Sequence, residues 1–216
     1  MLPKVIIHNL LSVDGCFTGF EADLETYYSI AAGFGADMCL IGSGTMAKAD
    51  EENVAEEPAD FIKPDPTTRP HAGYCVVADS RGICRNLHLF RRADYCKDVV
   101  VLVSATTPES HLRYLQERNY DYIIVGNDHV DYRKALEILY EKYHCRTLRV
   151  DSGGTLTSIL IQQGLVNEIS LIVAPLLTGN AQPALFGKLN LTKNINLKFV
   201  KCEPLSDGQL WITYRL

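Results

Sequence analysis

Two segments of the chain place glycines beside hydroxylated residues, a combination suited to binding phosphate groups. The first, "LIGSGTMAKAD", contains Gly42, Ser43, Gly44 and Thr45, and the second, "VDSGGTLTSIL", contains Gly153, Gly154, Thr155 and Leu156. Glycine lets a ligand approach the main chain closely, and the first N–H groups of a helix attract anions. Neither segment has the Gly-x-Gly-x-x-Gly spacing of the dinucleotide fingerprint. Two such turns favour an elongated, phosphate-rich ligand, and two unrelated helix caps are the alternative.

A third segment, "VVADSRG", ends an apolar run with Asp79, Ser80 and Arg81. At such a corner an acidic side chain can bind the ribose diol of a nicotinamide cofactor, whereas Ser with Arg can bind a 2′-phosphate. Both residue types are present, so their spacing does not decide between the two cofactors. A plain turn capped by Asp79 is the alternative.

The spacing of the Cys, His and Ser residues argues against a metal site and against a nucleophilic hydrolase. The seven cysteines are scattered and form no Cys-x-x-Cys pair, and the six histidines are single residues. Zinc ligands usually come in closely spaced pairs, so we expect no metal site. A serine hydrolase of the Gly-x-Ser-x-Gly type is also disfavoured, because that motif is absent. The cysteines indicate reduced thiols and therefore a cytoplasmic protein.

The composition narrows the classes of partner. The formal net charge is −5 and no block of basic residues occurs, so we expect neither a nucleic-acid partner nor binding to an anionic membrane. No apolar stretch is long enough to span a bilayer, and the N-terminus lacks the pattern of a cleavable signal. With 216 residues, 47% of them hydrophobic, residues 1–216 are expected to form one domain that binds a small molecule.

The elements that must position these segments are short apolar runs separated by helical patterns. Runs starting near positions 5, 37, 74, 98, 121, 147 and 169 predict strands covered on both faces. Helices are expected at 132–143, capped by Asp131, and from Pro108, capped by Thr107. This alternation predicts an α/β fold with a largely parallel sheet. The C-terminal "INLKFVK" and "LWITYR", joined through "SDGQ", predict an antiparallel hairpin, which makes the sheet mixed.

The segment 50–70 is acidic and rich in proline, with no sustained periodicity. It predicts a long loop, either an excursion over the surface or a lid over a substrate.

The order of these segments resembles a known family. "NLLSVDG", "GADMCLIGSGT", "VVADSRG", "VDSGGTLTSILIQQGLVNEISLIVAPLLTG" and "ALFG" are similar to the pyrimidine reductases of riboflavin biosynthesis, the reductase half of the bifunctional deaminase-reductase. The resemblance implies a dihydrofolate-reductase-like, three-layer α/β/α fold with a mixed, mostly parallel central sheet and an antiparallel C-terminal hairpin. It also implies an NADPH-dependent reductase, commonly a homodimer, that reduces a ribosylamino-pyrimidine 5′-phosphate.

By the same resemblance, the turns at 42–45 and 153–156 and the Ser80–Arg81 corner would line the cofactor site. Asp151 stands where relatives often carry Glu near the nicotinamide and substrate, and Asp14 in "SVDG" matches the Ser-Leu-Asp-Gly of the family. Both are candidate catalytic residues, as orienting groups or proton relays. Aromatic residues between them could stack on a heterocycle or lie in the core: Phe17, Phe20, Tyr27 and Tyr28.

The chain departs from the family after the first turn. Ala49 replaces an aspartate that relatives often carry, and an acidic run follows that would repel a phosphate dianion unless Lys48 or Arg69 neutralises it. A pterin or another unphosphorylated pyrimidine is therefore an alternative substrate. A catalytically inactive nucleotide-binding protein is the alternative from a different functional class.

Overall fold

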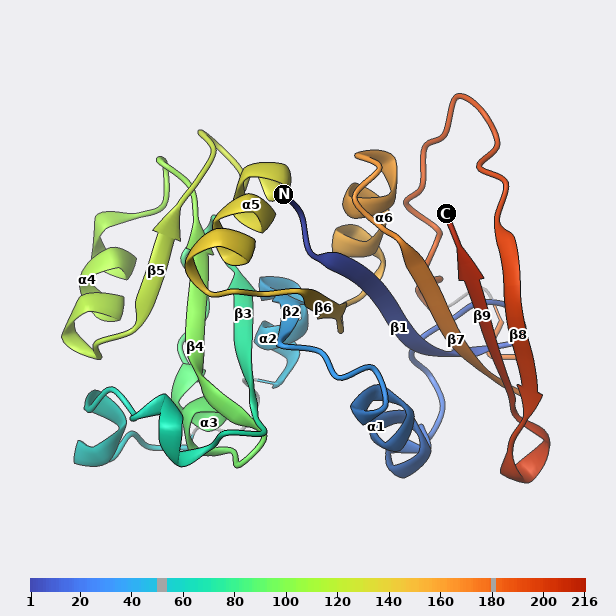
Figure 1. The fold of residues 1–216 in the computed structure, drawn as a ribbon, viewed down its shortest axis with the longest axis horizontal. Coiled ribbons are helices and arrows are strands. Elements are labelled where there is room, and N and C mark those ends of the chain that lie inside the picture. The colour runs from blue at the N-terminus through green and yellow to red at the C-terminus, as the bar shows by residue number, and fades with distance from the viewer. Residues whose placement is uncertain (50–53, 180–181) are drawn as a thin grey trace. The chain divides into compact units, whose positions relative to one another are not determined.

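The computed structural model describes residues 1–49, 54–179 and 182–216, which form two compact units drawn in Figure 1. The first unit comprises Met1–Pro3 and Asp37–Arg146, and the second comprises Lys4–Ala36 and Thr147–Leu216. Within the described residues, none of the helices combines the length and the apolar character needed to cross a membrane.

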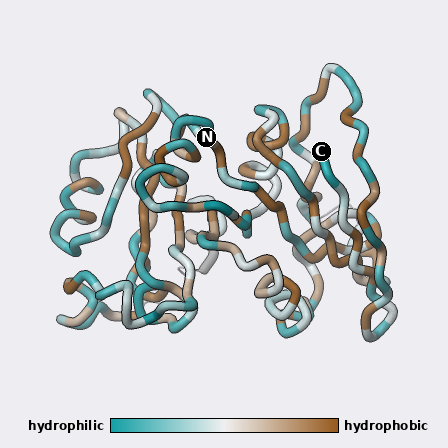
Figure 2. The backbone as a smooth tube through the Cα atoms, viewed as in Figure 1, coloured by the Kyte–Doolittle hydropathy of each residue, from teal (hydrophilic) through white to brown (hydrophobic). Residues whose placement is uncertain are grey.

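The first unit is built on four parallel strands in the order β5-β4-β3-β2. Their bounds are β2 (Met38–Gly42), β3 (Gly73–Ala78), β4 (Cys96–Val103) and β5 (Asp121–Ile124). Residues 99–103 of β4 are almost completely buried, as their continuous apolar run predicts. Figure 2 shows hydrophobic residues concentrated along these strands. Gly42 pairs with Ala78, so β2 and β3 end side by side.

Helices of the first unit follow the strands. They are α2 (Ser43–Ala49), α3 (Leu87–Arg92), α4 (Glu109–Glu117) and α5 (Tyr132–Lys142). The predicted cap of α5 is confirmed, because the Asp131 side chain accepts a hydrogen bond from the Lys134 N–H. The predicted Thr107 cap is wrong, because Pro108 occupies the N-cap of α4. The Thr107 hydroxyl instead donates to the Ser80 carbonyl, a bond that ties the start of α4 to the corner after β3.

The acidic, proline-rich segment is described from residue 54 onward. It contains the 3₁₀ turns η1 (Pro58–Phe61) and η2 (Pro66–Thr68). Its acidic side chains pair with arginines, Glu56 with Arg118 of the chain after α4 and Asp60 with Arg92 of α3. This part of the segment is therefore fastened to the helices by ion pairs. Residues 50–53 lie outside the described residues.

The second unit contains five strands in the order β6-β1-β7-β9-β8. They are β1 (Lys4–Ser12), β6 (Thr147–Val150), β7 (Glu168–Ala174), β8 (Lys198–Pro204) and β9 (Leu210–Arg215). β1 is parallel to β6 and β7, whereas β9 is antiparallel to both β7 and β8, which confirms the predicted hairpin. The hairpin turns through Asp207 and Gly208, both with positive φ. The helices are α1 (Leu24–Ala32) and α6 (Gly154–Gln162).

A buried histidine joins three elements of the second unit. The His8 ring stacks on Tyr27 with a centroid separation of 4.4 Å, and its Nδ1 lies 3.0 Å from the Ser170 hydroxyl. Tyr27 thus belongs to the core, and Phe20 packs against the same hydrophobic cluster. Tyr28 remains 53% exposed, and Phe17 is half-buried.

Candidate cofactor and substrate site

The first predicted phosphate-binding turn lies at the junction of β2 and α2. Gly42 is the last residue of the strand and Ser43 the first of the helix, so no loop separates them. Gly44 and Thr45 are exposed. A Cβ atom added at Gly44 would meet no described atom within 4 Å, and the backbone there is not in the left-handed region. The open space beside Gly44 can therefore accommodate a ligand.

The corner after β3 resolves the competing roles of its three polar residues. Asp79 is completely buried, and its Oδ2 accepts a hydrogen bond of 2.8 Å from the Cys84 N–H. This is the turn-capping role. Ser80 is half-buried, and its hydroxyl oxygen accepts a hydrogen bond of 3.1 Å from the Val130 N–H. Arg81 is exposed and forms no hydrogen bond or ion pair with the described part of the chain. Its guanidinium can therefore bind an anion.

Strands β2 and β3 lie side by side and bring the turn at 42–45 close to the Ser80–Arg81 corner. Because β2 and β3 are parallel and pair at Gly42 and Ala78, the residues 42–45 and the Ser80–Arg81 corner leave the sheet at the same edge. The carboxyl edge of parallel strands is where ligands bind in α/β proteins.

The second glycine turn, at the start of α6, packs against its own chain. A Cβ at Gly153 would lie 2.9 Å from the Phe17 Cζ, and one at Gly154 would lie 2.8 Å from the Leu185 carbonyl oxygen. Gly154 is therefore required by packing against the main chain, whereas a side chain at Gly153 would have to displace the Phe17 ring. Thr155 is exposed, whereas Leu156 is buried and can offer a ligand only its main chain.

Lys188 lies at this turn and was not predicted from the sequence. Its Nζ donates a hydrogen bond of 2.7 Å to the Thr155 hydroxyl, and it forms no ion pair with a described carboxylate. The "ALFG" segment brings it there, because the Leu185 N–H donates to the Gly15 carbonyl and Ala184 pairs with Cys16. The position of Lys188 directly after that segment is the only sequence signal for it.

Asp14 orders a loop of the second unit. Its carboxylate accepts hydrogen bonds from the Ser12 hydroxyl at 2.5 Å and from the Gly179 N–H at 2.8 Å. The Ser12 bond, followed by bonds from the Gly179 and Thr178 N–H groups, lowers the pKa of Asp14 to about 2. The carboxyl group is therefore ionised at neutral pH, and its described contacts order the loop at Thr178 and Gly179.

Asp151 follows β6 and pairs with Arg149 at 3.4 Å. The register of β6 with β1 places Val150 opposite Ile7, so Asp151 is level with His8. β1 continues to Ser12 before reaching Asp14, a further four residues or roughly 13 Å of strand. The described partners of the two candidate carboxylates differ: Asp14 contacts Ser12, Thr178 and Gly179, whereas Asp151 contacts Arg149.

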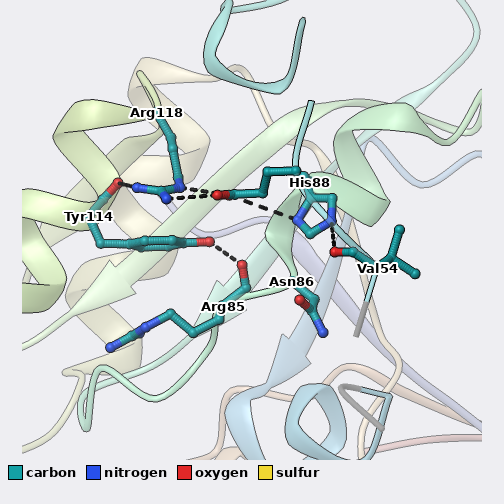
Figure 3. Close-up of a pocket in the computed structure, with 7 residues that line it drawn as sticks. Val54, Arg85, Asn86, His88, Tyr114 and Arg118 are labelled. Atoms are coloured by element: carbon teal, nitrogen blue, oxygen red, sulfur yellow. Dashed lines mark hydrogen bonds and ion pairs between the residues drawn. The ribbon is translucent and has the colours of Figure 1, made fainter. Parts of the chain in front are cut away.

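A cavity of about 320 Å³ lies elsewhere in the first unit, between residues 54–56, α3 and α4 (Figure 3). Two of its charged groups, Glu56 and Arg118, pair with each other, whereas Arg85 contacts Gly82, Cys84 and His111. Arg118 forms two hydrogen bonds with Glu56, and the His88 Nε2 contacts the Val54 carbonyl. No predicted site residue lines it, although Arg85 follows the Ser80–Arg81 corner by a few residues.

The sheet is mixed and mostly parallel, with helices between its strands. This architecture defines an α/β protein of the dihydrofolate-reductase-like class. A family model described as the RibD C-terminal domain matches residues 3–210, and the chain belongs to this family of riboflavin-biosynthesis reductases.

Individual relatives agree with this assignment. The chain is 29% identical to a 2,5-diamino-6-ribosylamino-4(3H)-pyrimidinone 5′-phosphate reductase of Archaeoglobus fulgidus, with 96% of each chain covered. A pyrimidine reductase-like protein of Corynebacterium diphtheriae superposes with a TM-score of 0.75 at 16% identity, covering 99% of this chain and 91% of that one. A dihydrofolate reductase of Enterococcus faecalis, complexed with NADP(H), gives a TM-score of 0.51 at 8% identity over 98% and 95% of the chains. The predicted fold class is confirmed.

Proposed function

We propose that this chain is an NADPH-dependent reductase that reduces a ribosylamino-pyrimidine 5′-phosphate, as the name of its Archaeoglobus relative describes for that protein. The observation that carries the proposal is the contrast within one corner. Asp79 is buried and engaged by the Cys84 N–H, so it cannot bind a ribose diol, whereas Arg81 is exposed and has no partner among the described residues. This arrangement favours a 2′-phosphate and hence NADPH over NADH.

Each unit, taken by itself, carries predicted cofactor-binding residues whose chemistry suits phosphate groups. In the first, the main chain of Gly42, Ser43, Gly44 and Thr45 would face phosphate groups, and Ser80 and Arg81 would hold the 2′-phosphate. In the second, Gly153, Gly154, Thr155 and Leu156 offer main-chain N–H groups, and Lys188 adds a positive charge beside Thr155. When bound, the nicotinamide supplies the hydride.

The protein's own contribution to the reaction is positioning. Asp14 holds the loop at Thr178 and Gly179 through main-chain hydrogen bonds, and Asp151 is held by Arg149. Phe17, packed against Gly153, presents a half-buried aromatic ring at the start of α6 that could stack on a flat substrate. Holding two planar reactants in contact can supply much of the rate enhancement of a hydride transfer.

The acidic segment is compatible with a phosphorylated substrate, because Glu56 and Asp60 are neutralised by Arg118 and Arg92. Arg69 is partly engaged within the protein, because its Nη1 donates to three main-chain carbonyls, including that of Cys96 at 2.6 Å. That engagement favours the second candidate, an unphosphorylated pyrimidine or a pterin. The side chain of Lys48 lies outside the described residues.

We also propose that the chain acts as one domain, in the cytoplasm and as a homodimer. All seven cysteines are free thiols, which suits a reducing compartment. β8 lies at the edge of its sheet, and Phe199 on it is 59% exposed, so a second copy could cover this strand.

The test is an assay of substrate-dependent oxidation. Purified protein is mixed with NADPH and, in separate reactions, with the ribosylamino-pyrimidine 5′-phosphate, its dephosphorylated form and a dihydropterin, while the absorbance of the reduced nicotinamide is followed. We expect oxidation with the phosphorylated compound and much slower oxidation with the other two. Faster oxidation with an unphosphorylated compound would establish the second candidate. NADPH binding without oxidation of any compound would identify a catalytically inactive nucleotide-binding protein.

A further inference from the structure

Three charged or titratable side chains beside the Ser80–Arg81 corner contact one another, two of them buried and the third, Arg85, exposed. Asp79 ends β3, Arg85 follows the corner, and His111 comes from α4. Asp79 and His111 are both completely buried. The Arg85 Nη1 donates a hydrogen bond of 2.7 Å to the His111 Nδ1, and the His111 Nε2 lies 3.5 Å from the Asp79 Oδ2.

These contacts determine where the imidazole carries its proton. Arginine only donates hydrogen bonds, so the His111 Nδ1 must be the acceptor and the ring proton must lie on Nε2, facing Asp79. Burial, assisted by the neighbouring Arg85 charge, lowers the pKa of His111 below its ordinary value, against the opposing effect of Asp79. The ring is therefore a neutral bridge between a guanidinium and a carboxylate.

Gly82, at the end of the corner, lies close to the His111 side chain. Gly82 has a φ of +64°, and a Cβ atom there would lie 2.7 Å from the His111 Cβ and 2.9 Å from its Cγ. The Gly82 N–H donates to the Asp79 carbonyl, and the Gly82 carbonyl accepts a hydrogen bond of 3.0 Å from the Arg85 Nη1. Both ends of the corner thus contact the cluster, and Ser80 and Arg81 lie between them.

We propose that His111 is a positioning residue that sets the main-chain path of the corner, and thereby the preference of the protein for a cofactor with a 2′-phosphate. The His111 side chain lies beside Gly82, and no described contact joins it to Ser80 or Arg81, so its effect is indirect. This inference rests on the proposed use of Ser80 and Arg81 in the function above. Ser80 is held separately, because its carbonyl accepts from the Thr107 hydroxyl and its own hydroxyl accepts from the Val130 N–H.

The test compares cofactor preference in three variants. His111→Phe keeps a planar ring but removes both polar contacts, and His111→Gln keeps an N–H group that can point toward Asp79. Leu115→Ala is the matched control, because Leu115 is a fully buried residue of the same helix that packs in the core of the first unit. The dissociation constants of NADPH and NADH are measured by calorimetry, and KM and kcat by substrate-dependent oxidation.

We expect His111→Phe to weaken NADPH binding about tenfold, the scale of one charge-assisted hydrogen bond, while NADH binding and kcat at saturating NADPH stay within about twofold. His111→Gln should recover part of the preference. Leu115→Ala should lower Tm without changing the ratio of the two dissociation constants. In an Arg81→Ala background, His111→Phe should have no further effect on that ratio.

Suppose that the wild-type protein binds NADPH normally but the His111 variants lose affinity for NADPH and NADH equally. That result would overturn this inference and leave the proposed function standing. The inference would also be overturned if His111→Phe still changed the ratio of the NADPH and NADH dissociation constants in the Arg81→Ala background. If His111→Phe does not fold, His111→Gln carries the same comparison. Failure of the wild-type protein to bind either cofactor would overturn the proposed function and this inference together.

Discussion

At the scale of single residues, the proposed preference for NADPH depends on Arg81. Arg81→Ala should weaken NADPH binding about tenfold or more and leave NADH binding nearly unchanged, because a charge-assisted contact to the 2′-phosphate is worth roughly 1.5–3 kcal/mol. Buried Asp79 cannot move out to compensate. Isothermal titration of each cofactor measures the effect, and similar losses for both would remove Arg81 from this role.

Two glycines predicted to serve the same purpose should respond differently to the same substitution. Gly44→Val should leave Tm nearly unchanged, because the space beside Gly44 is open, yet it should weaken NADPH binding by blocking close approach. Gly154→Val should destabilise the protein by roughly 1–3 kcal/mol, because its side chain would collide with the Leu185 carbonyl. Thermal unfolding and NADPH titration separate the two effects. Full NADPH affinity in Gly44→Val would mean that no ligand approaches there.

The residue types of the candidate site could be selected from the sequence, but their contacts within the protein could not. Ser80 and Arg81 were recognisable because their types suit a phosphate. The burial of Asp79 could not be recognised from the sequence, because its contacts are the Cys84 N–H and His111, which lies 32 positions away. Lys188 was missed because its contact with Thr155 joins segments 33 positions apart.

At the scale of elements, the acidic segment is held by ion pairs rather than by apolar packing. Asp60 is almost fully buried and accepts hydrogen bonds from Arg92 and from the Glu57 N–H. Asp60→Ala should therefore lower the free energy of unfolding by about 2 kcal/mol, since it leaves these donors unsatisfied. Glu57→Ala is the control: its side chain is 69% exposed, and the expected change is within about 0.5 kcal/mol. Urea denaturation measures both, and equal small effects would show that the segment is only loosely attached.

Strands were more predictable than helix starts, for a physical reason. The continuous apolar runs of β1, β3 and β4 are fully buried, so composition alone indicates them. The start of α4 was misplaced because the Thr107 hydroxyl, a good helix cap by type, bonds instead to Ser80 on a different loop. The short helix α3 was not predicted, because six residues give too little periodicity to distinguish a helix.

At the scale of the whole molecule, stability should fall in mild acid. Burial lowers the pKa of His8 from 6.5 to about 4, so the unfolded chain binds a proton between these values and the folded chain does not. The stabilisation is complete above pH 6.5 and is lost as the pH falls toward 4, by roughly 3 kcal/mol. The lowered pKa of His111 acts in the same direction.

Urea denaturation at a series of pH values from 8 to about 4 tests this expectation. The stability of the wild-type protein should decline through this range. His8→Gln should show a shallower decline, because it removes one of the two histidines whose pKa is lowered by burial. A stability that is independent of pH between 7 and 5 would contradict the assignment of His8 as a buried neutral ring.

The central claim is that a nicotinamide cofactor carrying a 2′-phosphate binds to this protein. The most direct measurement is isothermal titration of the folded wild-type chain with NADPH and, separately, with NADH. We predict saturable heat with NADPH and clearly weaker binding of NADH. The absence of heat with either reduced cofactor would contradict the account, and stronger binding of NADH would contradict the role given to the Ser80–Arg81 corner.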